Sequence, residues 1–200
     1  MSDTPPRDLV SLVGSRICHD LISPLGAIGN GLELLELSGV PDSPEMALIG
    51  ESVSNANARI KFFRVAYGAA APGAVVSARE INDVLTPNVD GRKVRIHWNL
   101  AGDPLRTDVK LAFLMIQCLE TVMPWGGDID VSKDGDRLRV AGRADQFKDE
   151  PALWAFVTQG DTGGELPPAR VEFGLIGPEL ASQGRQVQVT MGESEISFEC

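Results

Sequence analysis

The segment Ile17-Cys18-His19-Asp20-Leu21-Ile22-Ser23-Pro24 decides the fold of the first part of this chain. It lies in a strongly periodic stretch, from about residue 8 to residue 38, where apolar side chains recur at steps of three, four and seven. Such steps align apolar residues along one side of an α-helix. The stripe consists of Val10, Val13, Ile17, Leu21, Ile28, Leu32 and Leu35.

His19 is one of two histidines in the chain. Consecutive residues turn by about 100° around a helix, which places His19 on the side opposite the apolar stripe. Its neighbours one and two turns away are mostly small or polar, so we expect an exposed imidazole. The surface around it should be low, meaning that few bulky side chains rise beside the ring, so that a globular partner can approach. These neighbours are Leu12, Ser15, Ser23, Gly26, Asn30 and Glu33.

The helix also contains residues that weaken it. Pro24 removes a backbone donor and is expected to kink the helix near His19. Gly26, Gly29 and Gly31 each cost roughly 1 kcal/mol relative to alanine, and close approach of a partner or a flexible bend is a candidate reason for them. A lone histidine on a helix is most often an ordinary surface residue. The adjacent acid and the proline five residues on favour phosphoryl transfer instead.

A second helix is predicted over residues 43–67, with apolar residues on a heptad seam. The connection at residues 39–44 is short and rich in turn formers, which predicts an antiparallel hairpin. Because a two-helix hairpin has little core, we expect two copies to pair into a four-helix bundle, making a homodimer. The seam consists of Met46, Ile49, Val53, Ala56, Ile60, Phe63 and Tyr67.

Folding the hairpin back about Pro41 puts His19 level with about Phe63. Arg59, Phe62 and Arg64 are then expected near the same level. Their side chains could neutralise phosphate and contact a partner, or simply form a solvated helix face; the sequence leaves both interpretations open.

Residues 69–74, Ala-Ala-Ala-Pro-Gly-Ala, mark a boundary. We therefore divide the chain into a helical hairpin at 1–70 and an α/β sandwich at 71–200, an α+β protein with a mixed sheet and helices on one face. Beyond the boundary, Ser77 and Glu80 form a capping box, and Thr107 is expected to cap the next long helix. Predicted helices are 77 to about 86, 107–122, 151–158 and 168–182; predicted strands are 93–100, 129–132, 137–141, 186–191 and 195–198.

The second histidine, His97, lies in the predicted strand over 93–100. Val94, Ile96, Trp98 and Leu100 alternate toward the inner side of that strand. His97 then faces outward with no motif nearby, and we interpret it as structural.

Composition excludes several classes of function. The chain has 200 residues and a net charge of −10 without a basic stripe, which argues against nucleic-acid binding. No apolar run approaches the roughly 20 residues that span a bilayer, and the N-terminus does not resemble a secretion signal. Cys18, Cys118 and Cys200 lack metal-ligand spacing, and we expect free thiols in the cytoplasm.

A His-Asp helix hairpin followed by an α/β unit resembles a sensor histidine kinase, with His19-Asp20 and Pro24 matching the phosphoacceptor box. Residues 111–122 correspond to the nucleotide-binding helix of those enzymes, and residues 173–181 to their last glycine-rich element. The nucleotide-binding residues are eroded, since residues 116–121 contain no Asn and the Asp-x-Gly-x-Gly glycines are missing from residues 142–147. The stretch Asp161-Thr-Gly-Gly164 lies in the wrong place and is interpreted as a turn.

The whole chain is similar to the ChpT-type histidine phosphotransferases of bacterial cell-cycle phosphorelays. Residues 16–36 carry most of the resemblance, and residues 62–68 and 123–127 add to it. It implies a homodimer, phosphorylation of His19 at Nε2, and a degenerate ATPase domain that binds no ATP. The implied partners are the receiver domain of a hybrid histidine kinase and response-regulator receivers, with Mg²⁺ brought by the receiver and no cofactor or metal held by this chain.

In this interpretation His19 is the phosphoacceptor, and Asp20 orients the imidazole or helps to remove its proton. The expected docking residues are Ser15, Arg16, Ser23, Gly26, Asn30, Arg59, Phe62 and Arg64. Two alternatives stay open. One is a divergent kinase that autophosphorylates with ATP, and the other is a dimeric adaptor that binds receivers without chemistry.

Overall fold

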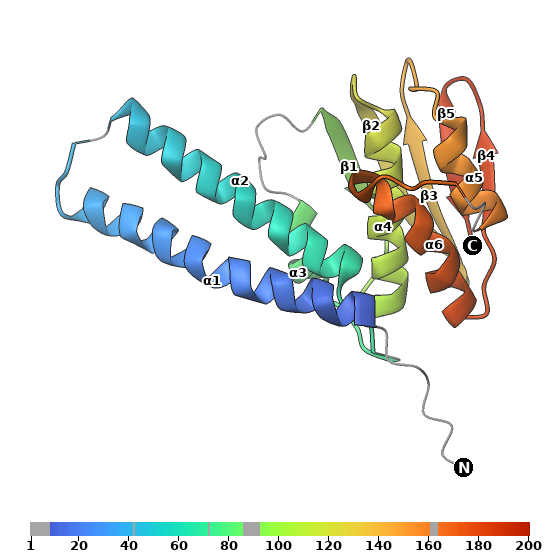
Figure 1. Cartoon of the computed structure of the whole chain (residues 1–200), viewed down its shortest axis with the longest axis horizontal. Coiled ribbons are helices and arrows are strands. Elements are labelled where there is room, and N and C mark those ends of the chain that lie inside the picture. The colour runs from blue at the N-terminus through green and yellow to red at the C-terminus, as the bar shows by residue number, and fades with distance from the viewer. Residues whose placement is uncertain (1–8, 42, 72, 86–92, 161–163) are drawn as a thin grey trace, which may run out of the picture.

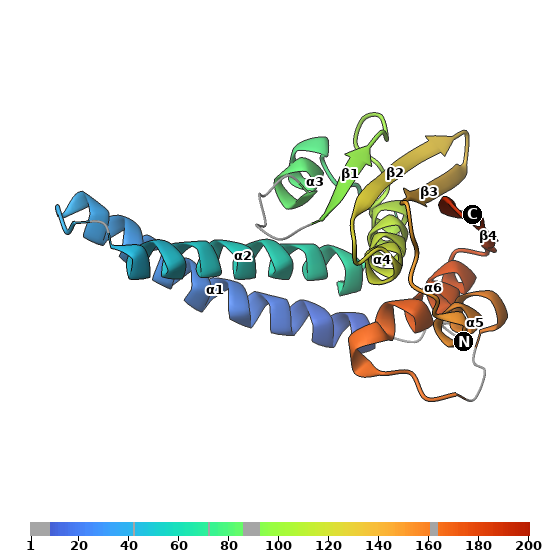
Figure 2. The same cartoon turned by 90° about the horizontal axis from the view of Figure 1, so that it is seen from above.

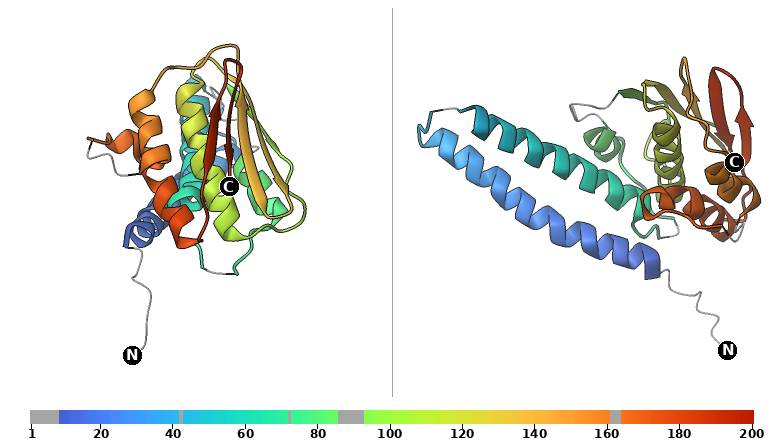
Figure 3. Two further views of the ribbon diagram at one scale, coloured as in Figure 1. Left: turned by 90° about the vertical axis from the view of Figure 1, so that its right-hand side faces the viewer. Right: turned by 45° about the horizontal axis from the view of Figure 1, so that its top comes forward.

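The computed structural model describes residues 9–41, 43–71, 73–85, 93–160 and 164–200. It confirms the predicted α+β class, with an N-terminal helical hairpin followed by an α/β unit on a five-stranded sheet (Figure 1). The hairpin projects from one side of the α/β unit, as the right-hand view of Figure 3 shows. The pairing of two hairpins into a bundle stays a prediction, as does the division at residue 70.

The hairpin consists of α1 (Leu9–Leu37) and α2 (Pro44–Tyr67). Gly14 fixes their register, because a Cβ added there would lie 3.3 Å from the Cβ of Tyr67. Two antiparallel helices in this register bring His19 level with about Phe63, as the sequence predicts.

Most of the apolar stripe of α1 does not face α2; Leu32 is the exception, since a Cβ added to Gly50 of α2 would lie 3.9 Å from its side chain. Ile17 and Leu21 on the stripe are 54% and 45% exposed, whereas Cys18 is only 6% exposed. Small residues make much of the contact, and a Cβ added to Gly29 would lie 3.8 Å from Val53. Apart from Leu32, the stripe is therefore an apolar surface on a flank of the hairpin that the described residues of one chain leave exposed.

The sheet has the strand order β1-β2-β3-β5-β4, in which β1 and β2 are parallel and the other neighbours antiparallel. Helices α4, α5 and α6 cover one face and leave the other bare, as predicted (Figure 2). The elements are α3 (Ala78–Leu85), β1 (Val94–Trp98), α4 (Arg106–Val122), β2 (Gly127–Asp134), β3 (Arg137–Arg143), α5 (Pro151–Gln159), the 3₁₀ helix η1 (Pro168–Arg170), α6 (Val171–Ser182), β4 (Gln188–Met191) and β5 (Glu195–Glu199).

Two predicted element starts are wrong. Helix α4 begins at Arg106, and Thr107 is not its cap; the cap position is Leu105, whose side chain makes no capping hydrogen bond. The backbone N–H of Arg106 donates to Ala74 O at 2.7 Å instead, so a contact distant in sequence starts this helix. The predicted helix at 168–182 divides into η1 and α6, which begins at Val171.

Helix α4 lies at the centre of the hydrophobic core. Its residues from Val109 to Ile116 are buried, and Phe113 packs its ring 4.6 Å from that of Phe62 on α2 and 6.0 Å from that of Trp98 on β1. One side chain thus contacts both the hairpin and the sheet.

Hydrogen bonds at the base of the hairpin join it to the α/β unit. Tyr67 Oη donates to Gln117 Oε1 at 2.6 Å, and the guanidinium of Arg106 donates to the carbonyl of Arg64 at 3.0 Å. Near the start of α1, the buried ammonium of Lys110 donates to Ser11 Oγ at 3.0 Å. Both helices of the hairpin are therefore attached to α4.

We expect Phe113→Ala to lower the free energy of unfolding by about 3–5 kcal/mol, because truncating a buried aromatic ring leaves a cavity. Urea denaturation followed by circular dichroism measures this loss. Trp125→Ala is the control, since Trp125 is 59% exposed and its truncation should change the free energy by less than about 0.5 kcal/mol. Equal losses for the two variants would contradict a core centred on α4.

Candidate functional site

The candidate site is the imidazole of His19 on α1. The side chain is 81% exposed, and its Nδ1 lies 3.2 Å from Oδ1 of Asp20. The other carboxylate oxygen of Asp20, Oδ2, accepts a hydrogen bond from Nε of Arg16 at 2.8 Å. Arg16, Asp20 and His19 thus form a line on the surface of α1, from guanidinium to carboxylate to imidazole.

Asp20 is ionised at neutral pH. The hydrogen bond with His19 lowers the pKa of its carboxyl group, and the guanidinium of Arg16 lowers it further. An ionised carboxylate only accepts hydrogen bonds, so the 3.2 Å contact requires a proton on Nδ1 of His19. In the neutral imidazole this leaves the lone pair on Nε2, the nitrogen that can act as a nucleophile.

The surface around His19 is low, as expected. Ser23 and Asn30 are exposed, and a Cβ added to Gly26 would meet nothing within 4 Å. Packing within this chain therefore does not explain Gly26. Ser15 has a structural contact, because its hydroxyl accepts a hydrogen bond from the backbone N–H of Ala69 at 3.2 Å.

The structure corrects the position of Phe62. This side chain is 5% exposed and packs on Phe113, so it belongs to the core and cannot contact a partner. The burial of Phe62 does not follow from its spacing along the helix, because the side of α2 that faces α4 is determined only when the hairpin docks on the α/β unit.

The two arginines expected near His19 lie on different sides of α2. Arg64 carries an ion pair with Glu80 of α3 at 3.3 Å, and its charge acts on the thiol of Cys18, the residue before His19. Arg59 is five residues away, which turns it by about 140° around the helix, and its guanidinium lies over the ring of Phe63 at 5.6 Å. Only Arg64 is therefore on the side of α2 that meets Cys18.

Cys18 packs between the helices. It is buried, and burial raises the pKa of its thiol. A thiol held in its neutral form in an apolar contact is a poor nucleophile, so Cys18 acts as a packing residue between the helices.

The helix that corresponds to a nucleotide-binding helix is enclosed by this chain's own side chains. Cys118 and Leu119 are fully buried. Thr121 donates to Glu172 of α6 at 3.3 Å, and burial raises the pKa of that glutamate. A Cβ added to Gly174 would lie 2.6 Å from Leu166, so Leu166 already occupies the space beside it.

Aromatic rings fill the neighbouring space. The ring of Trp154 lies 5.3 Å from that of Phe173 and 5.6 Å from that of Phe198, which joins α5, α6 and β5. The residues expected to form a turn at 161–164 lie outside the described part except for Gly164, which belongs to no helix or strand.

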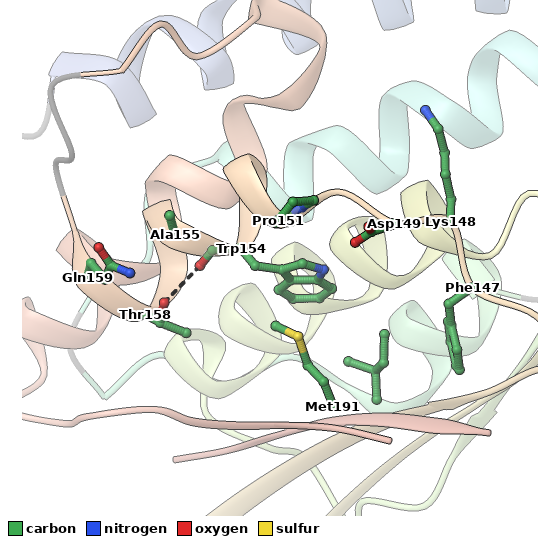
Figure 4. Close-up of a pocket in the computed structure, with 10 residues that line it drawn as sticks. Phe147, Lys148, Asp149, Pro151, Trp154, Ala155, Thr158, Gln159 and Met191 are labelled. Carbon is green, nitrogen blue, oxygen red and sulfur yellow. Dashed lines mark hydrogen bonds between the residues drawn. The ribbon is translucent and has the colours of Figure 1, made fainter. Parts of the chain in front are cut away.

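A cavity of about 410 Å³ lies between α5 and the strands of the sheet (Figure 4). Its wall is formed by the loop after β3, by α5, and by the β4–β5 hairpin, with Trp154 and Met191 facing each other across it. None of its lining residues comes from α1 or α2. The cavity is therefore separate from His19.

The structure adds a cluster on the bare face of the sheet that sequence reasoning missed. Arg95 donates to both carboxylate oxygens of Asp128, at 2.8 and 2.7 Å, and Nε2 of His97 lies 2.9 Å from the same carboxylate. These partners hold the pKa of Asp128 far below its usual range. The parallel pairing of β1 with β2 creates this cluster, and the outward position of His97 agrees with the prediction.

In the part of the chain that the structure describes, no group of three or more His, Cys, Asp or Glu side chains could hold a metal ion. No helix in that part is both long and apolar enough to cross a bilayer.

Comparison with known proteins gives three findings. Residues 78–195 match the family model of the histidine phosphotransferase C-terminal domain. The protein phosphotransferase ChpT of Brucella abortus (strain 2308) is 42% identical over 130 residues, which cover 64% of this chain and 62% of that relative's length. A solved structure of a bacterial phosphotransferase is 29% identical and superposes with a TM-score of 0.68 over 98% of both chains.

We expect Glu172→Gln to stabilise the protein at pH 7, because the pKa of this buried carboxyl is raised and its ionisation opposes folding. The gain should vanish below about pH 4, where both folded and unfolded wild type carry a protonated glutamate. Thermal unfolding at the two pH values measures it.

Glu179→Gln is the matched control on the same helix. Glu179 pairs with the buried Lys110 at 2.6 Å, so its neutralisation should lower stability by about 3 kcal/mol. A stabilising effect of both variants, or of neither, would contradict the conclusion that burial makes the ionised form of Glu172 unfavourable.

Proposed function

This chain belongs to the histidine phosphotransferase family, and from that premise we propose that it is the intermediate of a phosphorelay. His19 takes a phosphoryl group from the phosphoaspartate of one receiver domain and passes it to the aspartate of another. The observation that carries this proposal is the geometry at His19, whose exposed imidazole has Nδ1 engaged by Asp20 and Nε2 free.

The first transfer makes one bond and breaks one. The lone pair on Nε2 attacks phosphorus, the N–P bond forms, and the P–O bond to the donor aspartate breaks with its electron pair left on the carboxylate. The proton on Nδ1 stays in place, and Asp20 stabilises the positive charge that develops on the ring. Positioning of the two reacting groups supplies much of the rate in such a reaction.

The second transfer reverses these roles. A carboxylate oxygen of the acceptor receiver attacks phosphorus, and Nε2 leaves with the electron pair of the N–P bond. No proton is gained or lost over the two steps, which suits a carrier that must react in both directions. Mg²⁺, which neutralises charge on the phosphoryl group, would come with the receiver domain.

The proposed donor is the receiver domain of a hybrid histidine kinase, and the proposed acceptors are response-regulator receivers. The low surface formed by Ser23, Gly26 and Asn30 supports docking of a globular domain over His19. Arg64 is the remaining α2 candidate for contact on this side. Such a relay would operate in the cytoplasm.

We also propose that the α/β unit does not bind ATP. The support is physical: the helix at residues 116–121 has no Asn, Leu166 covers Gly174, and the rings of Trp154 and Phe173 fill the adjacent space. A nucleotide there would have to displace packed side chains.

A homodimer completes the proposal. Val10, Val13, Ile17, Leu21, Ile28 and Leu35 are exposed on one flank of α1 within a single chain. Pairing with a second copy would bury this stripe in a four-helix bundle. His19 lies on another side of α1, so dimerisation would leave it accessible.

A labelling experiment tests the function. The purified protein is incubated with a phosphorylated receiver domain, and separately with ATP and Mg²⁺. We expect acid-labile label from the receiver and none from ATP, with His19→Ala reduced to background and His97→Ala unchanged. Label from ATP would establish the divergent kinase. No label from either source, with a donor shown to be competent on another acceptor, would leave the adaptor.

The dimer has its own test. Wild type should sediment at twice the monomer mass of 21.4 kDa, and Ile17→Asp should sediment as a monomer, because a charge in an apolar interface is strongly unfavourable. Asn30→Asp is the control, since it places the same charge on the side of His19. A monomeric wild type at micromolar concentration would contradict the bundle.

A further inference from the structure

Arg16 makes a contact that docking alone does not explain. Its Nε donates to Asp20 Oδ2 at 2.8 Å, while Asp20 Oδ1 meets Nδ1 of His19 at 3.2 Å. The two oxygens of one carboxylate are thus divided between the guanidinium and the imidazole. A second exposed pair of the same spacing, Arg79 with Asp83 on α3, is longer at 3.9 Å.

The division matters because a carboxylate is rigid and planar. The terminal torsion of an aspartate is broad and roughly two-fold, so an unrestrained carboxylate on an exposed side chain rotates freely. Holding Oδ2 in one place aims Oδ1 in one direction. In this structure that direction is toward Nδ1 of His19.

We propose that Arg16 is a positioning residue for the phosphoacceptor: it holds Asp20 so that the imidazole of His19 keeps its proton on Nδ1 and offers Nε2 to the partner. This inference rests on the proposed phosphotransfer at His19. It differs from the docking role expected for Arg16 from the sequence, because the residue acts through Asp20 and not through the partner.

The charge of Arg16 has a second consequence. An aspartate beside the nucleophile would repel the incoming phosphoryl group, which is itself negatively charged. An arginine paired with that aspartate neutralises it without giving up the hydrogen bond to the ring. Because the three residues lie within two turns of one helix, the arrangement exists before any partner binds.

Nuclear magnetic resonance of the ¹⁵N-labelled full chain tests the proposal. The chain has two histidines, so His97→Ala assigns the imidazole signals of His19. At about pH 8, above the usual histidine pKa, the ¹⁵N shifts report the ratio of the two neutral tautomers. Exposed ion pairs at this spacing are weak, so Arg16→Met should lower the ratio of the Nδ1-protonated to the Nε2-protonated tautomer by about two-fold.

Two variants sharpen the result. Arg16→Lys keeps a cation one turn from Asp20 and should restore at least part of the ratio. Arg79→Met removes an exposed arginine of the same spacing on α3 and should leave the ratio unchanged. A ratio in Arg16→Met equal to or higher than wild type overturns the proposal.

Kinetics separate positioning from docking. With saturating phosphorylated receiver, Arg16→Met should lower the maximal rate of label transfer by about two-fold and leave KM for the receiver unchanged. A raised KM with an unchanged maximal rate would make Arg16 a docking residue and overturn the proposal. The tautomer ratio is measured without a partner, so failure of every receiver to label His19 would refute the proposed function and not the geometry.

Discussion

The burial of α4 is the constraint on which the rest of the molecule depends. Twelve of its 17 residues are buried, and it contacts the sheet, α6 and α2 at once. A helix enclosed on nearly all sides cannot move without opening the core, since protein interiors are close-packed. The hairpin is attached to α4 through Phe62 and through the hydrogen bonds of Tyr67 and Lys110. The position of His19 is therefore set by a helix that carries none of the proposed chemistry.

Helix α1 has three sides with different surroundings. Small residues such as Gly14 and Cys18 lie against α2 and allow the two backbones to come close. A second side carries the exposed apolar stripe that would pair with another copy. A third side carries His19 among small and polar neighbours. If α1 had a single apolar side, that side would have to pack against α2 and also against a second copy, and the two contacts would compete for the same residues.

The charged groups also lie in separate parts of the molecule. Lys110 and Glu179 pair in the interior, where an unpaired charge would be costly. Arg95, His97 and Asp128 pair on the bare face of the sheet, where no helix covers the strands. Around His19 the only charges on its own helix within a turn are Arg16 and Asp20, and they neutralise each other while directing the ring. Each histidine thus has its own carboxylate partner, Asp20 for His19 and Asp128 for His97. The contact is made through Nδ1 in His19 and through Nε2 in His97.

Local periodicity and turn residues in the sequence predict the helical hairpin, the α/β class and the exposure of His19. The sequence also places Arg16, His19 and Asp20 close together on one helix, where only a docking role was expected for Arg16; its contact with Asp20 comes from the structure. Four features appear only in the tertiary structure: Phe62 is buried, Arg59 and Arg64 lie on different sides of α2, α4 begins at Arg106, and Asp128 meets His97. Each of these depends on which element packs against which side, and a spacing of residues along one helix or strand does not contain that information.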